Sequence, residues 1–71
     1  MTILLETEFQ IGDIVKSRLD AEFTYIVNNF TIMAIDENGT TLCYLIDCAD
    51  PEGAIRVFRP YEVEIVEKIR I

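Results

Sequence analysis

Alternating hydrophobic and polar residues along this chain predict short β-strands. In the C-terminal segment, Val63 and Ile65 alternate with Glu62 and Glu64, and a period of two places successive side chains on opposite faces of a strand. Isoleucine and valine together outnumber leucine and alanine, and β-branched side chains suit a pleated surface better than a helix. We therefore expect strands over residues 14–19, 23–36, 40–47, 55–58 and 63–68.

Turn residues separate these segments. Asn38 and Gly39 form the strongest local pattern, because an Asn-Gly pair tolerates positive φ at both positions, as a tight hairpin requires. Residues 33–36 should therefore pair antiparallel with residues 41–45. Asn28 and Asn29 interrupt the alternation in the long second segment, which predicts either a bulge in one bent strand or a break between two strands.

Proline marks the approach to the last strand. Pro60 cannot donate to a ladder, so we expect a single 3-10 turn over residues 60–62 before the final strand. A chain of this length forms one domain, so residues 1–71 should be a single all-β domain. Short strands cannot hide their edges in an open sheet, which favours a bent sheet that is partly closed. We expect a small, partly open barrel of five to six antiparallel strands, with residues 1–8 as an extra edge strand or cover. Its predicted core is Ile11, Val15, Tyr25, Val27, Ile32, Leu42, Tyr44, Ile46, Val57, Val63 and Ile65.

The order of these motifs resembles the small SH3-like barrels of Tudor and KOW type. The chain has an F-x-x-G-D-x-V opening from Phe9 to Val15, then Tyr25-Ile26-Val27 in a bent strand, then the hairpin, and Pro60-Tyr61-Glu62-Val63 before the last strand. It looks most like short bacterial and phage-encoded barrels of unknown function. The resemblance implies the SH3-like fold and transfers no activity, because this fold hosts many unrelated functions.

Charge argues against polyanionic partners. The chain carries 13 acidic and 6 basic residues and no histidine, for a net charge of −7, and nucleic-acid affinity rests largely on Lys and Arg contacts with phosphates. We therefore do not expect nucleic acid or a membrane surface as a partner. The alternative is a nucleic-acid-related role, either weak binding through a basic face or acidic mimicry of nucleic acid; that face would need Lys16, Arg18, Arg56 and Arg59.

The N-terminal sequence and the two cysteines bear on the compartment. The first residues have no basic region, and their apolar run stops after three positions, which is typical of neither a signal peptide nor a membrane span. Two cysteines do not suggest a disulfide scaffold. These features lead us to expect a cytoplasmic protein.

The sequence offers no constellation for catalysis. Histidine, the commonest general base, is absent. Cys43 lies in an apolar strand where a thiol is usually packing. We predict a protein that is not an enzyme, without a cofactor or a small-molecule substrate.

Two binding motifs have simpler structural explanations. Cys43, Asp47, Cys48 and Asp50 fall close together, but a structural zinc site wants four ligands with paired spacing, so we expect a solvated acidic loop and no metal. Tudor-type barrels can hold methylated cations in aromatic cages, which here would use Tyr25, Tyr44 and Tyr61 with Asp47 or Glu62. We expect instead that these rings fill the core.

Several strands are apolar on both faces, and this is the feature that points to a function. The runs Tyr25-Ile26-Val27 and Leu42-Cys43-Tyr44-Leu45-Ile46 place apolar side chains outward as well as inward. Either the N-terminal Ile3-Leu4-Leu5 segment covers the outer face or another protein does. We expect a non-enzymatic protein-interaction or oligomerisation module, a homodimer or a complex with a protein partner. Its candidate interface residues are Ile26, Met33, Ile35, Cys43, Leu45 and Val66.

Overall fold

The computed structural model describes residues 2–70 and contains one antiparallel β-sheet. Among these residues the regular elements are five strands and one 3-10 turn, η1, as the sequence predicts. The fourth strand and the turn match their predicted bounds, and no end of the other strands differs from its predicted position by more than two residues. The elements are β1 (Ile14–Ser17), β2 (Thr24–Ile35), β3 (Thr41–Ala49), β4 (Ile55–Phe58), η1 (Pro60–Glu62) and β5 (Val63–Glu67).

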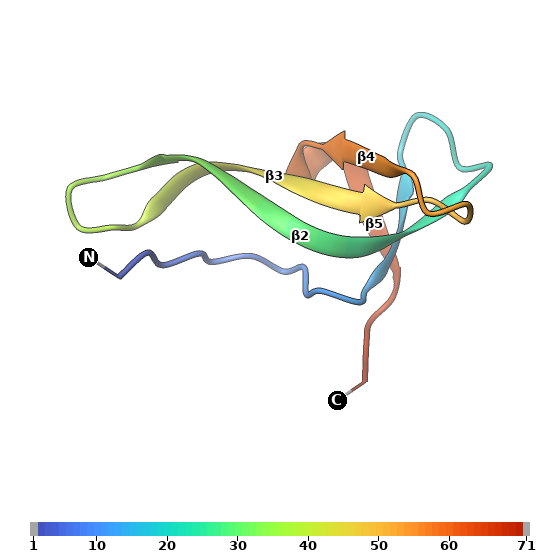
Figure 1. The fold of residues 1–71 in the computed structure, drawn as a ribbon, viewed down its shortest axis with the longest axis horizontal. Helices are drawn as coiled ribbons and strands as arrows, with labels where there is room; N and C mark the ends of the chain where they lie inside the picture. Colours follow the sequence, from blue (N-terminus) through green and yellow to red (C-terminus); the bar gives the residue numbers. More distant parts are fainter. Residues whose placement is uncertain (1, 71) are drawn as a thin grey trace.

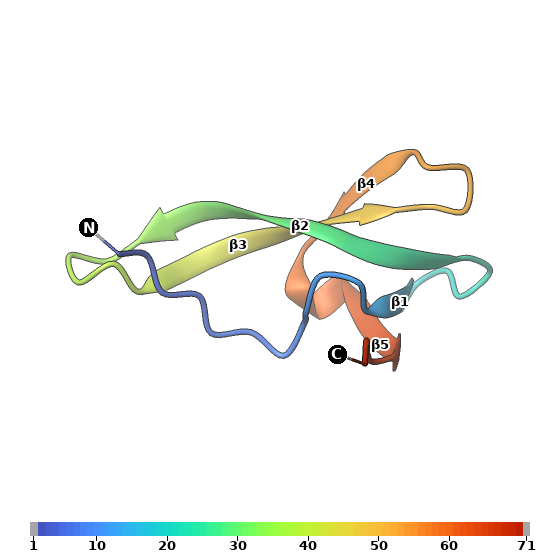
Figure 2. The same ribbon diagram turned by 60° about the horizontal axis from the view of Figure 1, so that its bottom comes forward.

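The sheet is strongly bent and is not closed. Its strand order is β4-β3-β2-β1-β5, so β4 and β5 lie at opposite edges. Figures 1 and 2 show the far half of the β2–β3 hairpin projecting as an arm from the other three strands. The molecule is accordingly elongated, with extents of 40 × 27 × 18 Å. The expectation of a small all-β fold that remains partly open is confirmed.

A bulge bends the long strand β2. The register of β2 against β3 shifts between Val27 and Asn29, where the sequence predicts a bulge or a break. The strand continues through this point, so the single bent strand is the correct alternative. A second irregularity lies between Ile32 and Ala34. A third shift lies between Ala34 and Ile35. An extra residue in one strand increases the local twist, so these irregularities bend the hairpin along its length.

The hairpin turn is built differently from the predicted one. Gly39 has φ +85°, whereas every non-glycine residue described, Asn38 included, has negative φ. The Asp36 carboxylate accepts hydrogen bonds from the amides of Asn38 (2.8 Å) and Thr40 (3.0 Å). A longer loop held by an Asp side chain thus replaces the two-residue turn with positive φ at both positions.

The core lies against one face of the sheet, here called the inner face. Residues directly opposite each other in a sheet share a face, and the pairs Val15–Tyr25, Val27–Cys48 and Ile46–Phe58 are all buried. The predicted core residues Val15, Tyr25, Val27, Ile46 and Val63 are buried, and Tyr44 and Ile65 pack against them; Ile32 is partly buried.

Three predicted core residues are exposed, each for a local reason. Ile11 lies in the turn over residues 10–13, and the neighbouring Phe9 enters the core instead. Val57 faces outward because the face assignment of β4 was wrong by one residue, so Phe58 is buried in its place. Leu42 alternates in step with the inward-facing Tyr44 and Ile46, but it lies on the arm beyond the core, and its side chain is 66% exposed.

The N-terminal segment runs alongside the arm. Leu4 forms a single parallel bridge with Thr40, and its backbone exchanges hydrogen bonds with Gly39 and Thr41 (2.8 and 2.9 Å). Further on, the Thr7 hydroxyl shares a hydrogen bond of 2.7 Å with the Tyr44 hydroxyl, and Phe9 reaches the core. Ile3 and Leu4 are themselves half-exposed, so this segment covers the arm only in part.

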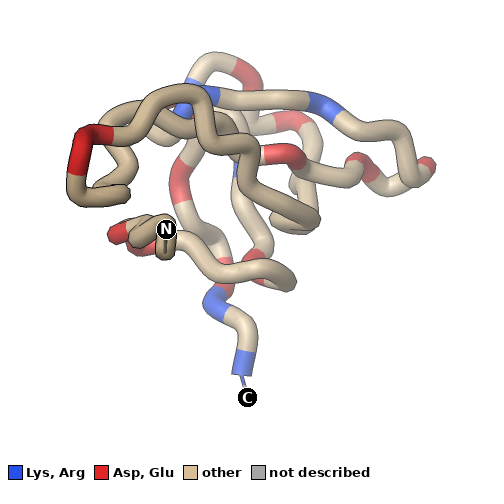
Figure 3. Tube along the Cα trace, turned by 60° about the vertical axis from the view of Figure 1, so that its left-hand side comes forward, with Lys and Arg blue, Asp and Glu red and all other residues tan. Residues whose placement is uncertain are grey.

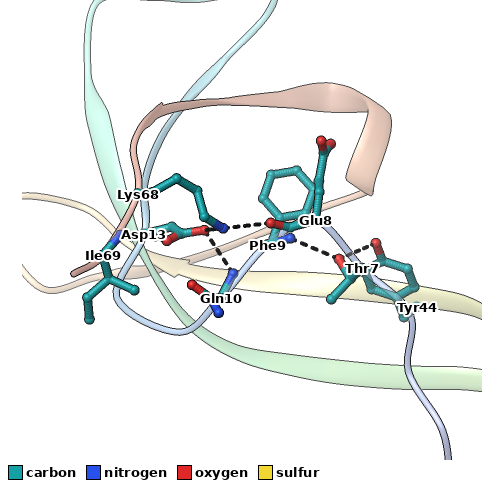
Figure 4. Close-up of polar contacts among 8 residues, drawn as sticks. All are labelled: Thr7, Glu8, Phe9, Gln10, Asp13, Tyr44, Lys68 and Ile69. Carbon is teal, nitrogen blue, oxygen red and sulfur yellow. Dashed lines mark hydrogen bonds and ion pairs between the residues drawn. The ribbon is translucent and has the colours of Figure 1, made fainter. Parts of the chain in front are cut away.

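A buried carboxylate joins the N-terminal turn to the C-terminal segment. The Asp13 side chain has no exposed surface. It accepts hydrogen bonds from the backbone amides of Gln10 (2.8 Å) and Ile69 (2.9 Å) and from the Lys68 ammonium (2.7 Å), as Figure 4 shows. Lys68 also donates to the carbonyl of Glu8. The partners of the carboxylate come from the turn before β1 and from the segment after β5. Asp13 therefore holds these two segments against each other.

The hydrogen bonds around Asp13 set its protonation. Burial by itself would raise the pKa of Asp13, but the bonds from Lys68, Ile69 and Gln10 and the charge of Lys68 outweigh it, so the pKa lies below its usual value of 3.8. A carboxyl group whose pKa is depressed by folding stabilises the fold fully above its unfolded-state pKa. That contribution is lost as the pH falls through the folded-state value.

We predict that Asp13→Asn lowers the free energy of unfolding by about 2–3 kcal/mol at neutral pH, because an amide nitrogen would face donors in a buried site. Urea denaturation measures the change, with Asp20→Asn in an exposed turn as the control. The difference between the wild type and Asp13→Asn should shrink below about pH 4. An Asp13→Asn protein as stable as the wild type at pH 7 would contradict this role.

We predict that Phe9→Leu costs about 1–2 kcal/mol of stability, whereas Ile11→Val changes it by less than about 0.5 kcal/mol. Phe9 is buried and Ile11 is exposed, although the hydrophobic pattern suggests the reverse. Thermal or urea unfolding of both variants tests the assignment, and a larger loss for Ile11→Val would refute it.

Candidate interaction surface

An apolar row crosses four strands on the outer face of the sheet. The register places Ile14 of β1 opposite Ile26 of β2, Ile26 opposite Ala49 of β3, and Ala49 opposite Ile55 of β4. Ile26 and Ile55 are 52% and 51% exposed. We call these four residues the outer row. A shallow hollow lies on it, lined by Ile14, Thr24, Ile26, Ala49, Asp50 and Pro51.

The six candidate interface residues are exposed, apart from the half-buried Leu45, but they do not form one patch. Ile26 belongs to the outer row. Leu45 lies opposite Thr31, nearer the arm. Met33, Ile35 and Cys43 lie on the arm itself, where Cys43 pairs with Ala34, and Val66 lies at the irregular junction of β5 with β1.

A polar stripe separates the outer row from the arm. Asn29 and Asp47 are paired there, and the Thr31 hydroxyl donates to the Asp47 carboxylate at 3.0 Å. The hydrophobic pattern of single strands shows outward apolar residues but does not show this division. Sequence analysis also missed Ile14, Ala49 and Ile55, because only the pairing register aligns them with Ile26.

The structure does not assemble the three tyrosines into a cage. Tyr25 is buried against Phe58 in an edge-to-face contact of 5.2 Å, and Tyr44 packs likewise against Phe30 at 6.1 Å. Tyr61 is exposed and its hydroxyl accepts a hydrogen bond from Arg59. The rings of Tyr25 and Phe58 already bind a cation of the chain itself, Arg56. Its guanidinium lies 5.7 Å from the centre of the Tyr25 ring and 5.3 Å from that of Phe58.

The four cations considered for a basic face are dispersed. Lys16 and Arg18 both pair with Glu64 at 3.3 Å at the β1–β5 side of the sheet. Arg56 lies on the inner face of β4, where its guanidinium donates to the Tyr25 hydroxyl at 2.9 Å. Figure 3 shows acidic positions interspersed among the basic ones along the chain. The described residues therefore present no continuous basic surface from this set.

The acidic loop before β4 uses its carboxylate locally. Asp50 accepts hydrogen bonds from the amides of Glu52 and Ala54, both at 2.9 Å, which is a common way for Asp to hold a turn. Within residues 2–70, no three Cys, Asp or Glu side chains are grouped as a metal site would require. Helices able to cross a membrane are likewise absent from this part of the chain.

Comparison with protein-family models, with curated proteins and with solved structures finds no match to this chain. The geometry of the outer row and of the arm is therefore the basis for the function proposed below.

We predict that one of the two thiols reacts in the folded protein. Cys43 is exposed and Cys48 is buried, and burial, with a smaller effect of Asp47, raises the pKa of the Cys48 thiol to about 11. A colorimetric thiol assay near pH 8 should titrate one cysteine per chain, and two after unfolding. Cys43→Ser should abolish the fast reaction; two fast thiols would contradict the burial of Cys48.

Proposed function

We propose that this protein is a non-enzymatic interaction module that self-associates through the outer row. The observation that carries the proposal is the direct register of Ile14, Ile26, Ala49 and Ile55 across four strands. The row is uncharged and two of its members, Ile26 and Ile55, are half-exposed, whereas the outer face of a stable monomeric sheet normally carries polar residues. Packing a second sheet on it would remove the exposed apolar surface from water.

A second copy of the chain suits the row because an uncharged apolar row can pack on its own two-fold image. At the β1 end Lys16 and Arg18 are paired with Glu64, and at the β4 end Asp50 and Glu52 lie in the turn before β4. A two-fold axis parallel to the strands lays the β1 end of one copy over the β4 end of its partner. The apolar row of each copy then packs on that of the other, as a symmetric dimer requires.

The layout of the sheet supports the SH3-like resemblance as part of this proposal. A 3-10 turn precedes the last strand, as the resemblance implies, and the last strand pairs with the first. In our proposal the barrel acts as a rigid platform that presents the outer row. No chemistry is assigned to it.

We predict that Ile26→Lys shifts the protein to monomer. Sedimentation equilibrium across a micromolar concentration series should show a mass above the 8.2 kDa monomer for the wild type and the monomer mass for the variant. Lys at this position lowers the net negative charge, so loss of association cannot be attributed to added repulsion between acidic chains. Leu19→Lys is the matched control, because Leu19 is 92% exposed and lies in the β1–β2 loop.

We further predict that added salt strengthens the association. Two copies, each with a net charge of −7, repel one another over distances that salt screens. Apolar contact survives that screening. The dissociation constant should therefore fall between low and physiological ionic strength. A wild type that stays monomeric at high micromolar concentration in both buffers, like Ile26→Lys, would refute the proposal.

A further inference from the structure

The edge of β3 that faces away from β2 is paired only at its two ends. β4 pairs with the residues from Ile46 to Ala49, and Leu4 bridges Thr40 at the other end. Over residues 42–45 no strand within the described chain lies against this edge. A strand edge of this length presents backbone donors and acceptors that an added strand can use.

Residues on either side of the gap explain why the chain leaves it open. Pro60 prevents β4 from continuing along β3, and the Glu62 carboxylate accepts a hydrogen bond from the Arg59 amide at 2.7 Å, which fixes the 3-10 turn. The turn then directs the chain towards β1, where Arg18 donates to the Glu62 carbonyl. On the other side, the Thr7–Tyr44 bond holds the N-terminal segment at the inner face, so it does not extend along the edge beyond Leu4.

A groove lies between the open edge and the 3-10 turn. It is lined by residues 42–45 and 59–61, and we call it the edge groove. Leu42 and Tyr61 are both about two-thirds exposed. The only charged side chain in the lining is Arg59, which donates to the Tyr61 hydroxyl at 3.1 Å. No carboxylate between residues 2 and 70 lies within 4 Å of its guanidinium.

We propose that the edge groove binds an extended acidic peptide segment of another protein, which adds to β3 as a strand and places a carboxylate against Arg59. Strand addition supplies main-chain hydrogen bonds, and alternate side chains of the peptide give specificity. The charge of the groove selects an acidic segment. A second copy of the same edge does not fit, because the lining holds no carboxylate to offer Arg59. This site goes beyond the outer row and does not depend on self-association.

The test is a titration of isotope-labelled protein with the synthetic peptide acetyl-Thr-Val-Glu-Val-Thr-amide, followed by amide chemical shifts. We expect saturable shifts concentrated at residues 42–45 and 59–61, with affinity in the millimolar range. The same peptide N-methylated at alternate amides should bind much more weakly, because it cannot complete the ladder. Shifts elsewhere, equal shifts with the methylated peptide, or no shifts would overturn the proposal.

A charge exchange tests the role of Arg59 separately. Arg59→Glu should weaken binding of the Glu peptide about three- to fivefold, the effect of one exposed ion pair, and should favour a peptide with Lys in place of Glu. Arg70→Glu is the control with the same change of charge in the C-terminal segment. Equal effects of the two variants would refute recognition by Arg59. The Ile26→Lys protein should bind the Glu peptide like the wild type. Peptide binding in the edge groove and self-association through the outer row can therefore fail independently of each other.

Discussion

Eight buried side chains hold this sheet together, and they lie against only one of its faces. A chain of 71 residues buries a smaller share of its surface than a larger domain does, and here no second layer is available for the outer face. The inner face is covered by the bend of the sheet itself and by Phe9. The outer row and the arm are exposed as a consequence, and the exposure of the outer row is the physical basis of the proposed self-association.

A polar contact compensates for the small core where the turn before β1 meets the segment after β5. The buried Asp13 carboxylate accepts hydrogen bonds from the backbone amides of Gln10 and Ile69 and from the Lys68 ammonium. A buried charge is tolerated only when it is hydrogen-bonded and paired. The site therefore fixes the F-x-x-G-D opening against the segment after β5, and it orients β1 between β2 and β5.

Local patterning in the sequence was sufficient to locate the strands, but not to align them with one another. The alternation at Val63 and Ile65 and the Pro60 turn led to the observed elements, because period and turn chemistry are local properties. The error in β4, where Phe58 rather than Val57 is buried, arose because a short strand of mixed apolar residues does not specify its own face. The role of Asp13 could not be predicted, because nothing nearby in the sequence indicates its bond to Lys68.

The sequence predicted that an apolar surface faces outward, but not which residues line up on it. Apolar residues on both faces of β2 and β3 indicated outward apolar side chains, and Ile26 and Cys43 are indeed exposed. The strand register brings Ile26 into line with Ile14 and Ile55. The polar stripe at Thr31 and Asp47 separates this row from Met33. Both features depend on contacts between strands, which local patterns do not show. The open stretch of β3 is likewise visible only once the lengths of β4 and of the Leu4 bridge are known.

The most direct test of the account is a search for intermolecular contacts in a mixed sample of isotope-labelled and unlabelled chains. An isotope-filtered NMR experiment should detect contacts between the methyl groups of Ile14, Ile26 and Ile55 in one copy and the same row in the other. If these methyl groups show only intramolecular contacts at high micromolar concentration, the claim that the outer row is an interface is contradicted.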